Sequence, residues 1–258
     1  MTEQWWTQLK SVTLHDDREP LPPLWPDGAS EEYVSARKAL LAKEVALRDQ
    51  IETVASLRRS LPAGTPVTDY ELTEGPRDLV HDDPVTPVRL SDLFREHETL
   101  IIYHLMFHPE DDAACAACSM WVDGFNGVAS HLTRRTGFAV IARAPIEKLR
   151  AWGRRRGWHG LRLVSSADSS FSRDLGFEAV SGGQWPTIAT FRRDGDEIRH
   201  WFSQCADLPE GERGIDLLTP VWNLFDLLPQ GRGDWLPDNT YPRDPRQCAM
   251  TGSAIDGD

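Results

Sequence analysis

The sequence predicts an α/β protein with a mixed β-sheet, and three segments carry that prediction. Thr99–Phe107 is apolar at both odd and even positions, which is typical of a strand buried on both faces of a sheet. A helical segment separates it from a second apolar run, Phe138–Arg143, so this part predicts parallel strands with a right-handed crossover. Thr187–Arg192 and Glu197–Phe202 flank Asp194-Gly195, a strong signal for a hairpin that adds antiparallel strands.

The N-terminal part of the chain is predicted to be an arm followed by one long helix. Four prolines make residues 1–29 irregular. Ser30 is a good helix N-cap, Glu31 and Glu32 complement the helix dipole in the first turn, and Pro62 ends the helix. Apolar residues recur along it at helical spacing, at Val34, Leu41, Val45, Leu47, Ile51, Val54 and Leu57. Because the opposite face is charged, we expect this amphipathic helix to pack on its own domain or on a second copy as a homodimer.

The rest of the chain divides into short elements marked by caps and turn residues. Residues between Pro66 and Arg89 are β-prone pieces interrupted by glycine and proline. The other predicted elements are helices at Asp92–His97, Cys115–Arg135, Ile146–Arg156 and Ile215–Leu228, and a strand at Leu161–Ser165. We expect an arm and helix over residues 1–62, an α/β domain over 63–230, and a flexible, Gly-, Pro- and Asp-rich tail over 231–258.

Composition and charge exclude several classes of protein. With 28 Lys and Arg against 40 Asp and Glu, the net charge of −12 disfavours binding to nucleic acid. No run approaches the ~18 apolar residues of a membrane span, and Met1–Lys10 has no secretory signal, so we expect a soluble cytoplasmic protein. No glycine-rich phosphate loop occurs, and we expect no cofactor.

The strongest chemical signal is the Cys-x-x-Cys pair Cys115 and Cys118, placed between the central strand and a helix. Unpaired N–H groups and the helix dipole stabilise a thiolate at such a position, so the pKa of Cys115 is expected to be low. Cys118 lies about one turn further on and can attack a mixed disulfide at Cys115. In a β-α-β unit this pattern indicates a thioredoxin-like redox motif, with a disulfide-bearing protein or a low-molecular-weight thiol as partner.

Two other interpretations of the pair stay open at this stage. Reduced cysteines often pack as small apolar side chains. A zinc site is the second, and His104, His108, Cys205 or Cys248 would then complete the four ligands. Because a second cysteine pair is missing, we expect no metal.

Four further residues are candidates for roles near the thiols. Pro186, preceded by Trp185, stands just before the hairpin strand, where thioredoxin-like folds carry a cis proline that presents backbone groups to the substrate. We therefore expect substrate binding at both residues and consider a cis bond at Pro186. His104 and His108 are candidates for proton transfer, although a histidine on a buried strand is more often part of the core.

The chain resembles a bacterial thioredoxin-like family, domain of unknown function 899, described as predicted dithiol–disulfide oxidoreductases. The resemblance covers about Ser30 to Leu228. It is carried by Ala36-Arg37-Lys38-Ala39-Leu40-Leu41, Leu90-Ser91-Asp92-Leu93-Phe94, Tyr103-His104-Leu105-Met106-Phe107, Cys115-x-x-Cys118-Ser119-x-Trp121-x-Asp123-x-Phe125-x-Gly127, Phe138-Ala139-Val140-Ile141-Ala142-Arg143-Ala144-Pro145 and Gly157-Trp158. It implies a thioredoxin-like fold with an N-terminal helical extension and a thiol–disulfide oxidoreductase in which Cys115 attacks and Cys118 resolves.

Two departures from known patterns bear on this expectation. Family members tend to have Pro-Gly between the cysteines, whereas Ala116-Ala117 stand here, so the redox potential does not transfer. The Pro-x-x-x-Thr-x-x-Cys spacing of peroxiredoxins fails, because counting from Pro109 gives Ala113 and Ala116. The alternatives are a peroxiredoxin-like thiol peroxidase, or a non-enzymatic binding or dimerisation module of the same fold.

Overall fold

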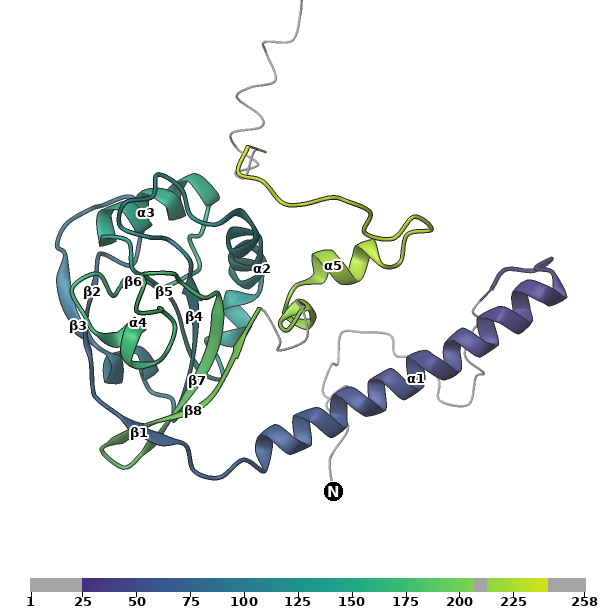
Figure 1. Cartoon of the computed structure of the whole chain (residues 1–258), viewed down its shortest axis with the longest axis horizontal. Coiled ribbons are helices and arrows are strands. Elements are labelled where there is room, and N and C mark those ends of the chain that lie inside the picture. The colour runs from purple at the N-terminus through teal and green to yellow at the C-terminus, as the bar shows by residue number, and fades with distance from the viewer. Residues whose placement is uncertain (1–24, 207–212, 241–258) are drawn as a thin grey trace, which may run out of the picture. The chain divides into compact units, whose positions relative to one another are not determined.

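The computed structural model describes residues 25–206 and 213–240, and a boundary between two compact units falls between Ser60 and Leu61 (Figure 1). The first unit contains α1 (Glu31–Arg59), whose N-cap Ser30 accepts a hydrogen bond from the Tyr33 N–H at 3.2 Å. The predicted helix start is therefore confirmed. No residue of α1 is buried, and the homodimer through this helix stays a prediction.

The second unit is built on one eight-stranded sheet of the described residues, with strand order β1-β8-β7-β4-β5-β6-β2-β3. The strands are β1 (Thr65–Val67), β2 (Glu71–Glu74), β3 (Thr86–Arg89), β4 (Thr99–Leu105), β5 (Gly137–Ala142), β6 (Leu163–Ser165), β7 (Thr187–Asp194) and β8 (Glu197–Cys205). The helices are η2 (Leu90–Phe94), α2 (Ala116–Leu132), α3 (Ile146–Arg156), α4 (Phe171–Asp174), η3 (Asp216–Leu218) and α5 (Pro220–Phe225).

The centre of the sheet has the predicted mixed topology. β4 pairs in parallel with β5, which pairs in parallel with β6. On its other side β4 pairs antiparallel with β7, and β7 and β8 form the predicted hairpin, with Gly195 at φ +63° in the turn. A left-handed backbone conformation in a tight hairpin turn favours glycine, which explains the Asp-Gly signal.

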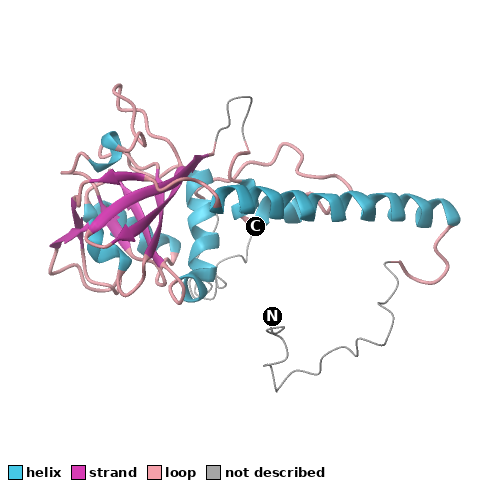
Figure 2. Ribbon diagram, turned by 90° about the horizontal axis from the view of Figure 1, so that it is seen from below, coloured by secondary structure: helices cyan, strands magenta, loops and turns pink. Residues whose placement is uncertain are grey.

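Apolar side chains form one core on each face of the sheet. Figure 2 shows helices on both sides of the strands. On one face Tyr103 and Leu105 of β4 pack with residues of α2 and α3. On the other face Leu100 and Ile102 pack with η2 and with Phe171 of α4. The alternation along β4 confirms that this strand is covered on both sides, and it decides which of its side chains can reach α2.

The C-terminal helix predicted over Ile215–Leu228 is wrong in extent. The chain forms the 3-10 turn η3 and then α5, which begins at Pro220. A proline disfavours helical backbone at the preceding residue, and Thr219 is accordingly extended, with ψ 135°. The predicted helix at Asp92–His97 is likewise the shorter 3-10 helix η2. Among the described helices none combines the length and apolar character that crossing a membrane would require.

Candidate active site

Cys115 is the N-cap residue of α2, directly after the loop that leaves β4. Its backbone N–H donates to the Met106 carbonyl at 3.0 Å, which ties the start of the helix to the end of the central strand. Its sulfur accepts a hydrogen bond from the Cys118 backbone N–H at 3.4 Å. The thiol sulfur thus occupies the place that a serine or aspartate oxygen takes in an ordinary N-cap.

This position lowers the pKa of Cys115 to about 6. The largest cause is a hydrogen bond from the Cys118 thiol, and the backbone N–H groups of Cys118 and Ala117 add to it, while burial acts in the opposite direction. Each of these donors stabilises the thiolate more than the thiol. The exposed residues Glu110 to Asp112, which precede the pair, are not among the causes of the shift.

Cys118 has the opposite properties. It is fully buried, and its pKa lies well above the ordinary value. Its thiol donates a hydrogen bond to the Cys115 thiolate, burial disfavours its charged form, and the Cys115 thiolate repels a second charge. The hydroxyl of Tyr103 moderates that rise. This hydroxyl is buried, and no described residue meets the usual distance and angle of a hydrogen bond to it. At neutral pH the pair therefore holds one thiolate, on the more accessible sulfur, and one thiol.

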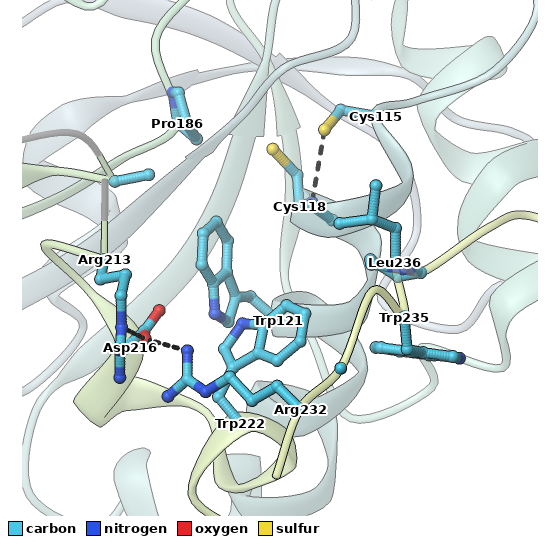
Figure 3. Close-up of a pocket in the computed structure, with 14 residues that line it drawn as sticks. Cys115, Cys118, Trp121, Pro186, Arg213, Asp216, Trp222, Arg232, Trp235 and Leu236 are labelled. Atoms are coloured by element: carbon cyan, nitrogen blue, oxygen red, sulfur yellow. Dashed lines mark hydrogen bonds and ion pairs between the residues drawn. The ribbon is translucent and has the colours of Figure 1, made fainter. Parts of the chain in front are cut away.

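Both cysteines line a cavity of about 400 Å³ whose walls come from distant parts of the chain (Figure 3). Pro186 and Ala206 line it from the ends of the β7–β8 hairpin. The remaining lining comes from α2 and from residues 213–237, namely Ala117, Trp121, Arg213, Asp216, Trp222, Arg232, Gly233, Trp235, Leu236 and Pro237.

The C-terminal part of this wall is held together by an ion-pair cluster and by stacked rings. Asp216 accepts from Arg213 and from Arg232, each at 2.7 Å, and Arg232 also binds Asp226 at 2.7 Å. Arg232 lies over the ring of Trp222 at 5.2 Å from its centroid. The rings of Trp222 and Trp235 pack edge to face at 5.6 Å. These contacts give the segment a defined position beside the thiols.

Asn239 ties the far end of the same segment to the body of the unit. Its amide donates to the Ala114 carbonyl at 3.0 Å, one residue before Cys115. Arg156 and Arg155 of α3 donate to its side-chain and backbone oxygens at 3.3 and 3.2 Å. Residues 231–240, for which the sequence predicts a flexible tail, thus form part of the site, while 241–258 lie outside the described residues.

Pro186 faces the two sulfurs across the cavity, as Figure 3 shows. Its peptide bond to Trp185 is trans, which corrects the cis bond considered from the sequence; within the described chain the cis bond is Asp83–Pro84. The side chain of Trp185 is 44% exposed and does not line the cavity. Substrate binding by these two residues stays a prediction.

His104 lies on the opposite face of the sheet from Cys118. Along β4 its neighbour Tyr103 points to α2, whereas the His104 ring packs against Phe177 in the other core. Burial lowers its pKa to about 4, so the ring is neutral. Its Nδ1–H then donates to the Trp185 carbonyl at 3.1 Å, and its Nε2 accepts from the Ser172 hydroxyl at 3.1 Å. His104 thus orients the chain before Pro186 and is not placed for proton transfer to the thiols.

This burial gives a testable pH dependence of stability. Because the folded-state pKa of His104 lies below the unfolded value, the unfolded chain binds the proton first as the pH falls. As the pH falls from 6.5 to 4, protonation of this one group in the unfolded chain should lower the free energy of unfolding by about 3 kcal/mol. Over the measured interval from pH 7 to pH 4.5, we expect His104→Gln to lose about 2 kcal/mol less stability than the wild type in guanidinium unfolding. Equal losses in the two proteins would contradict the assignment.

The other predicted site residues do not gather at the thiols. His108 lies in the loop after β4, where its Nδ1 accepts from the Glu110 N–H at 3.2 Å, and it does not line the cavity. Cys205 pairs in register with Thr187, which is itself opposite His104, so strand alternation places it on the other face. Cys248 lies outside the described residues. Within residues 25–206 and 213–240 no cluster of three metal-ligating side chains occurs.

A buried polar cluster fixes α2 against α3. Asp123 of α2 accepts from the Trp158 indole N–H at 2.7 Å and from Arg156 Nε at 3.1 Å, and it forms an ion pair with the same guanidinium. The side chain of Arg156 is fully buried. Ser119, one turn earlier, accepts from the Trp152 indole N–H at 3.1 Å. The polar residues that follow Cys118 in the sequence therefore anchor the helix that carries the thiols.

These elements define the class of protein. A β-α-β unit whose first helix begins at a cysteine pair, continued by an antiparallel hairpin on the other side of the first strand, is a thioredoxin-like α/β arrangement. More particularly, the chain belongs to a family of bacterial proteins of unknown function, DUF899, whose sequence model matches residues 25–246. The predicted family and fold class are confirmed.

Comparison with solved structures finds peroxiredoxins at low sequence identity. AhpC of Enterococcus faecalis is 15% identical, with 60% of this chain and 87% of that chain covered and a TM-score of 0.43. A reduced 2-Cys peroxiredoxin of Plasmodium vivax is 13% identical, with coverages of 60% and 78% and a TM-score of 0.43. The peroxidoxin BcpB of Mycobacterium tuberculosis is 19% identical, with coverages of 55% and 84% and a TM-score of 0.39. No curated protein matches the chain.

Proposed function

We propose that the protein is a thiol–disulfide oxidoreductase in which Cys115 attacks a disulfide and Cys118 resolves the mixed disulfide. One observation carries this proposal: the Cys115 sulfur is the N-cap of α2, accepts from the Cys118 N–H, and opens onto a cavity. A low pKa at an accessible sulfur beside a buried thiol is the arrangement that thiol–disulfide exchange requires.

In the first step the Cys115 thiolate attacks one sulfur of the substrate disulfide. A new sulfur–sulfur bond forms to Cys115, the substrate bond breaks, and the other substrate sulfur leaves as a thiolate. The negative charge on Cys115 is then gone, so the hydrogen bond and the repulsion that raise the pKa of Cys118 no longer act.

In the second step Cys118 loses its proton to solvent and its sulfur attacks Cys115. The Tyr103 hydroxyl, which lowers the pKa of Cys118, stabilises the thiolate as it forms. The second substrate thiolate leaves, and the protein has given up two electrons as a Cys115–Cys118 disulfide. A dithiol, or two molecules of a small thiol, must return these electrons for turnover.

The proposal predicts the order in which the two sulfurs react. With limiting iodoacetamide, mass spectrometry should find Cys115 alkylated before Cys118, because the thiolate is the nucleophile. The variant Cys118→Ala should accumulate a mixed disulfide at Cys115, since no second thiol can release the substrate. Equal labelling of both sulfurs and no trapped species would rule out the assigned roles.

A thiol peroxidase is the competing function. A brief pulse of hydrogen peroxide on reduced Cys118→Ala separates the two, because a peroxidase forms sulfenic acid at the attacking cysteine and releases water. We expect mixed-disulfide formation with small disulfides to be faster than sulfenic acid formation at equal concentrations. The reverse order would favour the peroxidase.

A further inference from the structure

We infer that the cavity beside Cys115 binds a small, uncharged, apolar disulfide that carries a hydrogen-bond acceptor, in preference to an extended protein chain. This inference rests on the proposed function and adds the class of substrate.

The shape of the site suits a small molecule. A cavity of about 400 Å³ has the size of a small-molecule pocket, which typically measures roughly 300–1,000 Å³. Residues 213–237 line it beside the sulfurs, and Asn239 anchors that segment to the Ala114 carbonyl next to Cys115. An extended polypeptide would have to share this space with the anchored segment, whereas a small disulfide fits inside it.

The chemistry of the lining suits an apolar ligand. The side chains that could flank a bound disulfide are mainly apolar, with Trp222, Trp235 and Leu236 on the C-terminal wall and Pro186 opposite. Leu236 is 76% exposed, an unfavourable position for a leucine that a bound apolar group would partly cover.

The charges of the lining suit an uncharged ligand. Arg213 and Arg232 contact the cavity, but Asp216 lines it with them and binds both guanidinium groups, and Asp226 binds Arg232 as well. Two cations and two carboxylates therefore cancel, and the cluster offers an anionic ligand no net attraction. A charged disulfide would gain little here and would lose hydration on entering.

The cavity wall also contains an unpaired hydrogen-bond donor. Trp121 lines the cavity, is 7% exposed, and its indole N–H is buried without a hydrogen-bond partner among the described residues. Buried donors normally find an acceptor, and leaving one unpaired costs about 1–3 kcal/mol. A ligand in the cavity that presents an acceptor atom to this N–H would satisfy it.

Two leucines of the same segment provide a matched test. Leu236 lines the cavity, whereas Leu227 does not, and their exposed fractions are 76% and 78%. Reduced full-length protein is mixed with 4,4′-dithiodipyridine, with glutathione disulfide, or with insulin, and the second-order rate constant of exchange is measured for each. The ratio of wild type to variant is taken for every disulfide, so that the intrinsic reactivity of the disulfide cancels.

We expect Leu236→Ala to lower the rate constant for the neutral aromatic disulfide by about 3- to 10-fold, as partial loss of one apolar contact implies, and those for the other two by less than about 2-fold. Leu227→Ala should change none of them. Trp121→Phe, which removes the N–H and keeps a ring, should slow the aromatic disulfide selectively. Equal effects of the two leucine variants, or equal losses for all three disulfides, would overturn the inference.

The trapping experiment separates failure of this inference from failure of the proposed function. If Cys118→Ala forms a mixed disulfide with 4,4′-dithiodipyridine but the leucine variants behave alike, exchange at Cys115 stands and the substrate class is wrong. If no disulfide of the three forms a mixed species, the proposed function itself fails.

Discussion

Replacing Cys115 by serine is expected to abolish exchange with small disulfides, a loss of at least about 10³-fold in rate, because a hydroxyl cannot replace the thiolate nucleophile. Cys118→Ser should retain the first attack, so that one equivalent of substrate thiol is released and the reaction stops at the mixed disulfide. Stopped-flow detection of the released thiol distinguishes the two variants. Release by Cys115→Ser at the wild-type rate would contradict the assigned nucleophile.

The rate of thiol release in this experiment is also expected to rise with pH. The thiolate is the deprotonated form, so the rate rises with pH and reaches half its plateau near the pKa of Cys115, which lies at about 6. An ordinary thiol would reach half-plateau near ~8.5. A half-point above about 8 in the wild type would mean that the N-cap position does not stabilise the thiolate.

Replacing Asp123 by alanine is expected to lower the free energy of unfolding by about 3 kcal/mol, near the lower end of what loss of one partner of a buried ion pair costs. The fully buried guanidinium of Arg156 loses its carboxylate, and the indole N–H of Trp158 loses an acceptor at 2.7 Å. Asp123 itself is one third exposed, which places the effect at the lower end. Chemical denaturation monitored by circular dichroism measures the change.

Glu96→Ala is the control for this effect. Its carboxylate is 70% exposed and lies 3.8 Å from Arg95 and 3.6 Å from His97, so we expect a change below about 0.5 kcal/mol. Asp123→Asn, which keeps an acceptor for the indole, should fall between the two. Similar losses in Asp123→Ala and Glu96→Ala would show that the polar cluster does not anchor α2.

The sequence predicted the central sheet and the start of α2 because local patterns determine them. Thr99–Phe107 is apolar at both odd and even positions, and only a strand with a core on each face accommodates this pattern. Ser30 marked the start of α1, because capping acts within a few residues. The position of Cys115 at the helix N-terminus follows from the same local signals.

The wall of the cavity could not be predicted, because distant contacts create it. Nothing in the local sequence around Asn239 indicates that its amide meets the carbonyl of Ala114, and residues rich in glycine and proline are typical of a flexible tail. The orientation of His104 also required the structure, since its face depends on the register of β4 between the two cores. The cluster of arginine and aspartate next to Trp222 was a weak signal that this region is ordered.

The tether between Asn239 and Ala114 has an evolutionary consequence. Sulfur reactivity arises within a few residues of Cys115, whereas the apolar enclosure depends on a stretch that begins about a hundred positions later in the chain. Homologues that diverge or terminate before this tether could retain the reactive thiol while accepting different molecules, so ligand preference can drift without any change at the cysteines.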